Sequence, residues 1–192
     1  SVVAETVQKI LDVTITWKIE AAGKIDADIA VTKDDEFPDL PRFGVRMFLD
    51  KKLSAVRYFG MGPQESYCDK HQAASHGLYQ ANVDDLHEDY IRPQENGSHY
   101  DCEYVELNNS RYGIVASAEN AFSFNASYYT QEELEEKTHN YELTESDSVV
   151  FCVDYALNGI GSNSCGPVVL EQYRFDDVLF RFQFTLIPYV KG

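Results

Sequence analysis

The chain has 192 residues, of which 44% are hydrophobic, and this length and composition suit one domain with a single buried core. It carries 32 acidic residues against 16 Lys and Arg, which gives a formal net charge of −16 at pH 7. A field of that sign repels nucleic-acid phosphates and anionic lipid headgroups. The composition therefore argues against nucleic acid and membrane surfaces as partners, and it leaves neutral molecules such as sugars open.

Other features of the whole chain exclude further classes. No apolar run approaches about 18 residues, so we expect no membrane-spanning helix, and no signal peptide opens the chain. Because the chain begins with Ser1 instead of Met, we expect a piece of a longer protein. The cysteines form no C-x-x-C motif and have no histidine at zinc-ligand spacing, so we expect reduced thiols and no metal site. They are Cys68, Cys102, Cys152 and Cys165.

The first third of the chain predicts two β-hairpins. Apolar and polar residues alternate from Leu11 to Ile19 and again over Ile25–Val31, which is the pattern of a hairpin with one solvent-exposed face. Arg42–Leu49 and Leu53–Phe59 flank a short polar segment and predict a second hairpin.

The remainder predicts a long loop, one helix and a series of antiparallel strands. Lys70–Tyr90 lacks clear periodicity and is expected to be a loop. Thr130-Gln131-Glu132-Glu133 is a capping box, which predicts a short helix at Gln131–Lys137. Strands are expected at Cys102–Leu107, Arg111–Ser117, Ala121–Tyr129, Val149–Ala156, Val169–Phe175 and Val178–Ile187. The predicted fold class is therefore all-β and antiparallel, with a core stripe of alternating phenylalanines in the last strand.

The segment Gly60–Asp69 (GMGPQESYCD) carries side chains suited to a binding site. Its two glycines and its proline force a tight reversal of the chain. Glu65, Tyr67 and Asp69 follow at alternate positions, so an extended backbone would point all three to one side. Two interpretations stay open: a buried turn whose carboxylates cap backbone N–H groups, and a loop that contacts a sugar.

Two later loops have comparable composition. Tyr90–Gly97 closes on an Asn-Gly turn, and its Gln94, Glu95 and Asn96 suit sugar hydroxyls and a hydrogen-bonded turn equally well. Gly159–Pro167 is rich in glycine and small polar residues, which lets the backbone approach a ligand closely. It does not predict a nucleotide site, because no lysine follows and no helix start is evident.

These three loops resemble, in order, features of the C-terminal, small-chain type of domain of bacterial β-galactosidases, which belong to glycoside hydrolase family 2. The most specific of them is Gly-x-Gly-Pro-x-Glu-x-Tyr-x-Asp at residues 60–69. Three further stretches are similar to the family: Leu40–Gly44, Phe124–Tyr129 and Gln131–His139. The resemblance covers the chain from Trp17 to Ile187.

The resemblance implies a fold and an activity. The fold is an antiparallel β-supersandwich of the galactose mutarotase type with one short helix, and residues 1–192 are expected to form a single domain, the later two-thirds of the family's C-terminal domain. The activity is hydrolysis of terminal β-D-galactosides such as lactose with retention, by two glutamates about 5–5.5 Å apart. In the family these glutamates and the magnesium ligands belong to a (β/α)₈ barrel, which 192 residues cannot hold. The chain alone is therefore expected to have no catalytic residue, metal or cofactor and to be inactive.

The family organisation also implies partners. The catalytic barrel of the parent chain is the expected protein partner and galactosides are the expected ligands. Unpaired strand edges invite self-association into a homo-oligomer. We expect a cytoplasmic protein, with the periplasm as the alternative, since no targeting segment lies in this chain.

One position departs from the family pattern. In well-known members the glycine-rich loop places a tryptophan against the sugar, whereas here Cys165 stands at that position and the loop is one residue shorter. Hydrogen bonds from Ser162, Asn163 and Ser164, together with the shape of Cys165, are expected to replace the aromatic platform beside the substrate.

A free-standing carbohydrate-binding module is the alternative interpretation. Such a module would need its whole sugar site within this chain, with an exposed aromatic ring as the platform. Tyr67, Tyr79 and Tyr90 are the candidates.

A mutarotase-like epimerase is a third interpretation. That chemistry needs a histidine acid and a carboxylate base that converge on the sugar ring. His71, His76 or His87 would be the acid, and Glu65 or Glu95 would be the base.

Overall fold

The computed structural model describes residues 2–3, 9–160 and 168–192. The strands are β1 (Val2–Val3), β2 (Lys9–Ile19), β3 (Ile25–Lys33), β4 (Arg42–Asp50), β5 (Ala55–Gly62), β6 (Ser75–Asn82), β7 (His99–Asn108), β8 (Tyr112–Ser127), β9 (Ser148–Leu157) and β10 (Leu179–Val190). Within the described ranges they are joined by one α-helix, α1 (Gln131–Glu136), and by the 3₁₀ turns η1 (Val83–Leu86), η2 (Asn140–Glu142) and η3 (Glu171–Tyr173).

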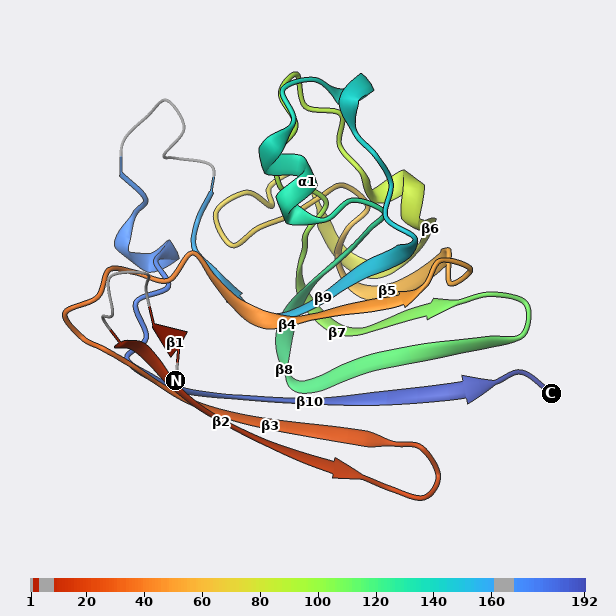
Figure 1. The fold of residues 1–192 in the computed structure, drawn as a ribbon, viewed down its shortest axis with the longest axis horizontal. Helices are drawn as coiled ribbons and strands as arrows, with labels where there is room; N and C mark the ends of the chain where they lie inside the picture. Colours follow the sequence, from red (N-terminus) through yellow and green to blue (C-terminus); the bar gives the residue numbers. More distant parts are fainter. Residues whose placement is uncertain (1, 4–8, 161–167) are drawn as a thin grey trace.

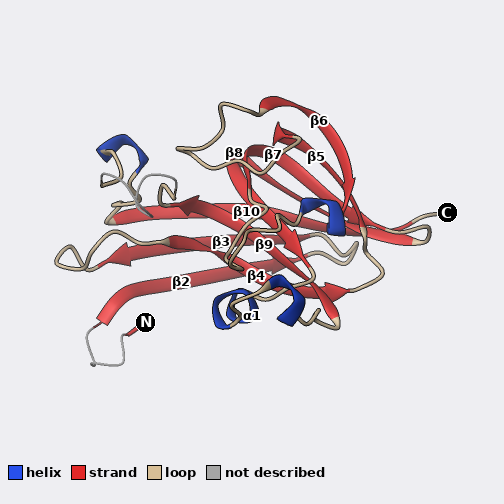
Figure 2. Cartoon of the chain, turned by 90° about the horizontal axis from the view of Figure 1, so that it is seen from above, coloured by secondary structure: helices blue, strands red, loops and turns tan. Residues whose placement is uncertain are grey.

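The strands pair in antiparallel fashion in a sheet that folds over on itself. One path runs β1-β2-β3-β10-β8-β7-β5-β6. A branch leaves this path at β8. The first part of β8 pairs with β10 and the last part pairs with β9, which in turn pairs with β4, while β7 pairs with residues in both parts of β8. Figure 1 shows β4 and β9 lying over the long strands β2, β3 and β10, and Figure 2 shows the same layers from above.

The N-terminal hairpin and the last strand form one wall of the core. β2 and β3 form the predicted hairpin, paired from Leu11 opposite Lys33 to Ile19 opposite Ile25, and β10 pairs with the other edge of β3. Side chains alternate between the faces of a strand, so Phe180, Phe182 and Phe184 all point to the same face. All three are buried, which confirms the predicted core stripe.

Aromatic rings connect this wall to the second layer. Phe180 of β10 meets Phe43 of β4 edge to face, with ring centroids 5.0 Å apart, and stacks on Tyr155 of β9 at 4.8 Å. β9 is buried on both faces, as a central strand requires. One hydrophobic cluster therefore runs between the layers, and the predicted all-β antiparallel sandwich with one short helix is confirmed.

The helix α1 begins at the predicted residue because Thr130 caps it. The Thr130 hydroxyl accepts a hydrogen bond from the Glu133 N–H at 3.1 Å. The Glu133 carboxylate does not close the capping box; it accepts a hydrogen bond from the Thr144 N–H at 2.8 Å. In the described part of the chain, no helix has the length and apolar character needed to cross a membrane.

The predicted second hairpin is wrong. β4 pairs with β9, whereas β5 lies between β6 and β7. Both edges of β5 are therefore occupied, and the buried β9 needs a partner on each edge to satisfy its backbone groups. The polar segment after β4 passes from one layer to the other instead of closing a hairpin.

The region 70–90 is not a loop throughout. Ser75–Asn82 forms the edge strand β6, which pairs with β5. Its half-buried positions are Gly77, Tyr79 and Ala81, and the residues between them are exposed. Because two of the three inward residues are small, the alternation carries little hydrophobic signal.

Two later strand predictions also differ from the structure. The strands expected on either side of Glu119 and Asn120 are one continuous β8, in which these two residues are exposed between the part that pairs with β10 and the part that pairs with β9. The strand expected at Val169–Phe175 instead contains η3. Val169 and Phe175 are buried and fix this segment by packing, without a strand partner.

The central position of β9 gives a stability prediction. Phe151 is fully buried, so Phe151→Ala leaves a cavity, and we expect the free energy of unfolding to fall by about 3–5 kcal/mol. Phe48 on the neighbouring β4 is 57% exposed, and Phe48→Ala is expected to cost about 1 kcal/mol or less. Urea titration followed by circular dichroism measures both values. Equal losses for the two variants would contradict the central placement of β9.

Candidate functional site

The polar loops of the sequence motifs lie against one another. The Gly97 N–H of the second loop donates a hydrogen bond to Glu65 Oε2 at 2.9 Å. The Ile160 N–H, at the start of the glycine-rich loop, donates to Asp69 Oδ1 at 3.1 Å. The turn at residues 60–69 therefore contacts both other loops, and we call this meeting point the loop junction.

Glu65 is a buried carboxylate with four hydrogen-bond donors. Besides the Gly97 N–H, these are the Tyr67 hydroxyl at 3.2 Å, the Lys70 ammonium at 2.5 Å and the Tyr90 hydroxyl. Burial to 5% side-chain exposure opposes ionisation, but the hydrogen bonds outweigh it and hold the pKa of Glu65 below its usual value. Glu65 is thus ionised at neutral pH and holds the second loop against the turn.

Asp69 fixes the start of the glycine-rich loop. A Cβ on Gly159 would lie 2.8 Å from Asp69 Oδ2, so this close approach depends on glycine. The neighbouring Cys68 thiol lies 3.6 Å from the Leu157 carbonyl oxygen, on the strand that leads into the loop. The residues predicted to line the sugar site lie outside the described residues: Ser162, Asn163, Ser164 and Cys165.

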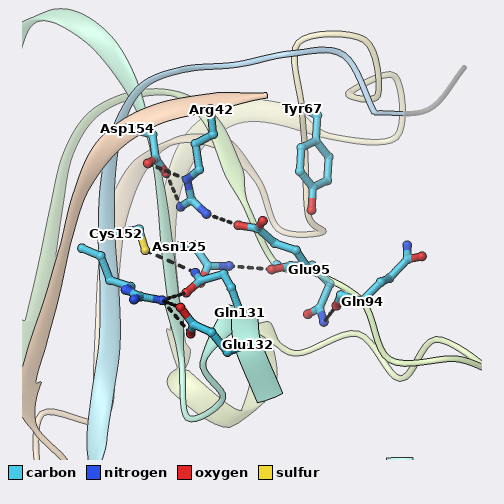
Figure 3. Close-up of polar contacts among 12 residues, drawn as sticks. Arg42, Tyr67, Gln94, Glu95, Asn125, Gln131, Glu132, Cys152 and Asp154 are labelled. Atoms are coloured by element: carbon cyan, nitrogen blue, oxygen red, sulfur yellow. Dashed lines mark hydrogen bonds and ion pairs between the residues drawn. The ribbon is translucent and has the colours of Figure 1, made fainter. Parts of the chain in front are cut away.

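Arg42 ties the β4–β9 pair to the second loop. Its guanidinium donates to both carboxylate oxygens of Asp154 on β9, from Nε at 2.7 Å and from Nη2 at 2.6 Å. Its Nη1 donates to Glu95. Figure 3 shows Arg42 between these two carboxylates. Asp154 is only 1% exposed, so the pair is a buried one.

The surroundings of Asp154 make this partner necessary. Burial raises the pKa of Asp154 to about 6, and the hydrogen bonds from Arg42 oppose that rise. Burial acts on Arg42 in the opposite direction, but the bonds to Asp154 outweigh it and raise the pKa of the guanidinium. A Cβ on Gly44 would overlap Asp154 Oδ1, and β4 shifts its register between Phe43 and Gly44. The bulge and the glycine together make room for the carboxylate.

A polar cavity of about 280 Å³ lies beside this pair. Its walls are formed by Arg42, Gly44, Arg46, Glu95, Gln131, Cys152 and Asp154. Arg46 donates to Gln131 and Glu132 at the start of α1, each at 2.8 Å, and the Gln131 amide lies 3.5 Å from Cys152 Sγ. These contacts from α1 are drawn in Figure 3. Each charged side chain in the wall has a partner of opposite charge.

This cavity and the loop junction both lie in the part of the chain that matches one protein family. A family model described as β-galactosidase small chain matches residues 1–186. The chain belongs to that family. The resemblance inferred from the loop motifs is therefore confirmed, and the parent family of this small-chain domain is the β-galactosidases, which are glycoside hydrolases.

Individual β-galactosidases match most of this chain with a small part of their own length. The protein of Actinobacillus pleuropneumoniae is 50% identical over 179 residues, that of Staphylococcus xylosus 37% over 186, and that of Kluyveromyces lactis 32% over 168. These alignments cover 93%, 97% and 86% of this chain. They cover 17%, 19% and 16% of the relatives, so the small-chain domain corresponds to less than a fifth of those proteins.

The second loop of the small-chain domain is organised by Asn96. Its Oδ1 accepts from the Glu88 N–H and its Nδ2 donates to the Gln94 carbonyl, both at 2.9 Å. Its backbone oxygen accepts from Asn125 Nδ2 of β8 at 2.5 Å. Asn96 is therefore engaged by the turn, while Gln94 and Glu95 are exposed. Gly97 follows with φ of +71°, a conformation that favours glycine.

The tyrosines proposed as sugar platforms differ in exposure. Tyr67 is 3% exposed, so its ring cannot serve as an exposed platform. Tyr79 and Tyr90 are half-buried. The hydroxyl of Tyr90 is bound at the loop junction, and that of Tyr79 contacts Ser75.

The histidines of the epimerase interpretation have other partners. His71 Nδ1 lies 2.9 Å from the Tyr67 carbonyl oxygen and His76 Nε2 lies 3.0 Å from the Asp101 carbonyl oxygen. Within the described ranges, no hydrogen bond or ion pair joins these histidines or His87 to the two candidate base glutamates. The acid–base pairs of that interpretation are not assembled here.

The sequence motifs did not single out Arg42 and Asp154. One signal for Asp154 was present, because it is the one charged residue in an otherwise apolar run that forms β9, and buried carboxylates need partners. Arg42 stands in the family-like stretch Leu40–Gly44, but nothing in that stretch pointed to a buried carboxylate as its partner. Its partner lies 112 residues away, and only the β4–β9 pairing brings them together.

Loss of the buried pair is expected to destabilise the fold strongly. Arg42→Met leaves the Asp154 carboxylate buried without its partner, and we expect the free energy of unfolding to fall by about 3–5 kcal/mol. Arg46→Met is the matched control, since the Arg46–Glu132 pair is exposed and such pairs contribute about 1 kcal/mol or less. Urea unfolding at neutral pH measures both losses. A loss for Arg42→Met as small as the control would show that Asp154 does not depend on Arg42.

The lowered pKa of Glu65 predicts a component of acid sensitivity. Because the folded-state pKa lies below the ordinary value of 4.5, ionisation of Glu65 stabilises the fold above that pH, and this contribution is lost as the pH falls through the folded-state pKa. Wild type is expected to be more stable than Glu65→Gln at neutral pH, with a difference that shrinks once the pH drops below 4.5. Urea midpoints across this pH range provide the measurement. A pH-independent difference would contradict the assignment.

Proposed function

We propose that this small-chain domain packs against the catalytic barrel of a longer β-galactosidase and completes its galactoside site with the glycine-rich loop. The longer protein would hydrolyse terminal β-D-galactosides such as lactose with retention, and the chain alone would be inactive. The observation that supports this role is the anchoring of the loop: Asp69 accepts a hydrogen bond from the Ile160 N–H and packs against Gly159. The family-like turn thus sets where the loop leaves the domain.

The two carboxylates that share Arg42 support placing the chemistry elsewhere. A retaining glycosidase needs two carboxyl groups about 5–5.5 Å apart on either side of the scissile bond, one of them able to donate a proton to the leaving oxygen. Glu95 and Asp154 share the guanidinium of Arg42, and Asp154 is 1% exposed. A substrate oxygen would have to displace Arg42 to reach Asp154. We therefore assign this trio to holding the second loop.

The remaining features of the proposed function concern the longer protein. In the described part of this chain, no three His, Cys, Asp or Glu side chains are grouped so that they would hold a metal ion. We place the magnesium ligands of the family in the rest of the longer protein, and we propose a cytoplasmic location for it.

The anchoring role of Asp69 can be tested in the longer β-galactosidase that carries this domain. Asp69→Ala removes the hydrogen bond to the Ile160 N–H, so we expect the loop to be held less firmly and KM for a chromogenic galactoside to rise about three- to tenfold, with a smaller change in kcat. Asp50→Ala is the matched control, because Asp50 lies at the other end of β4 and contacts Tyr112. Steady-state kinetics distinguishes the two.

Two outcomes would contradict the proposed function. One is equal kinetic constants for Asp69→Ala, Asp50→Ala and wild type, which would exclude a role of the anchored loop at the substrate site. The other is hydrolysis of the chromogenic galactoside by the purified 192-residue chain, which would show that the chemistry does not need the barrel.

A further inference from the structure

The strand β2 leaves one edge of the sheet open. One of its edges pairs with β3, and its other edge pairs with β1 at Lys9 and Leu11. Among the described residues, no strand lies beside that second edge from Asp12 to Ile19. Figure 1 shows β2 at the lower border of the sheet. An open edge presents unpaired N–H and C=O groups, to which a further strand can be added.

The backbone groups on this open edge are those of the odd-numbered residues. In an antiparallel pair, every second residue exchanges hydrogen bonds with the partner strand. The Asp34 N–H donates to the Ile10 carbonyl oxygen at 2.9 Å, at one end of the β2–β3 pair. At the other end the Glu20 N–H donates to the Lys24 carbonyl oxygen at 2.9 Å. Even-numbered residues therefore bond toward β3, and the odd-numbered residues of Val13–Ile19 direct their N–H and C=O groups outward.

The side chains of the odd-numbered residues are apolar and only partly covered. Ile15 and Trp17 are each 46% exposed, and Ile19 is 71% exposed. Trp17 meets Phe184 of the core stripe edge to face, with ring centroids 6.3 Å apart. These side chains thus continue the core face toward the hairpin turn, where it opens to solvent. A strand added to the edge would extend this face and cover part of it.

A second copy of β2 matches this edge. Two identical strands related by a two-fold axis run antiparallel. When the axis passes beside Ile15, that residue faces its own copy and Trp17 faces Val13 of the other chain. Odd-numbered residues then stand opposite odd-numbered residues, so the outward N–H and C=O groups of both strands are hydrogen-bonded to each other.

The charges on the other face of β2 select the same register. Lys18 of one copy stands opposite Asp12 of the other, and the symmetry repeats the pair. Both residues fall at non-hydrogen-bonded positions, where opposite side chains lie closest. Within one chain they form exposed ion pairs with Glu20 and Lys9, so both side chains can reach across the edge. Moving one copy by two residues loses both new pairs, and in one direction it sets Asp12 opposite Glu20.

The local charge of β2 permits contact between like chains. The whole chain has a formal net charge of −16, and two copies therefore repel one another, although salt screens this beyond about 8 Å under physiological conditions. β2 itself carries Lys9 and Lys18 against Asp12 alone. The repulsion is therefore not concentrated at the contact.

We propose that two copies of this chain associate through β2, which pairs antiparallel with its own copy and joins the two sheets into one. The contact is independent of the proposed function, because it uses none of the loops that meet at the loop junction. A pairing confined to Asp12–Lys18 buries a small area, and interfaces below about 1,200 Å² are typically transient. We therefore expect a weak dimer, with Kd on the order of 100 µM.

The test follows the oligomeric state of the 192-residue chain by sedimentation velocity, from about tenfold below to tenfold above that Kd. We expect monomer at the low end and dimer at the high end. Trp17 is the one tryptophan of the sequence, and its emission should shift to the blue over the same range because the dimer covers its ring.

Charge variants test the register. Asp12→Lys and Lys18→Asp each set like charges opposite one another at two symmetry-related places, so each should weaken dimerisation about tenfold. The double variant Asp12→Lys/Lys18→Asp restores both pairs with exchanged signs, and its affinity should return to within about threefold of wild type. Lys51→Asp is the matched control. It makes the same change of charge in the segment after β4, and it should leave dimerisation unchanged.

A backbone variant tests the edge itself. Ile15→Pro removes an N–H that points away from β3, which an edge strand tolerates, so circular dichroism should show the fold retained while dimerisation is lost. A chain that stays monomeric at 1 mM, or a dimer that survives Ile15→Pro, would overturn the proposal. Slow amide exchange at Ile15 and Trp17 in the monomer would overturn it as well, because another segment would then occupy the edge.

Discussion

The buried ion pair between Arg42 and Asp154 is the interaction on which the surrounding structure depends. A carboxylate with almost no solvent contact is tolerated only with a partner that satisfies both of its oxygens, and Arg42 supplies two hydrogen bonds. The third contact of the same guanidinium reaches Glu95, so the position of the second loop follows from the position of β4. Gly44 is required for the same reason, since any side chain there would occupy the space of the carboxylate. Strand, bulge and loop therefore form one unit.

The parts of the fold that the sequence predicted are those with strong local periodicity. The β2–β3 hairpin and the phenylalanine stripe of β10 follow directly from the alternation of apolar residues. β6 escaped prediction because Gly77 and Ala81 leave its inward face almost without a hydrophobic signal. The pairing of β4 with β9 was missed for a different reason. A strand pattern shows which face is buried and carries no information on which distant strand lies beside it.

The same distinction applies to the candidate site. Glu65, Asp69 and Asn96 were found because they stand in compact motifs, and each holds one of the loops in place. Motifs could not show that Glu65 binds four donors, since two of those donors come from the second loop, some twenty-five to thirty-two residues further along the chain.

The continuity of β8 has a consequence for how the domain unfolds. One strand of 16 residues pairs with β10 along its first part and with β9 along its last, and β7 pairs with residues in both parts. Opening either layer would strip part of this strand of its partners and expose apolar rings that pack between the layers. Neither layer can therefore melt while the other stays intact. The domain gains cooperativity from a shared strand, so that amide protons deep in both layers are protected by one global opening equilibrium.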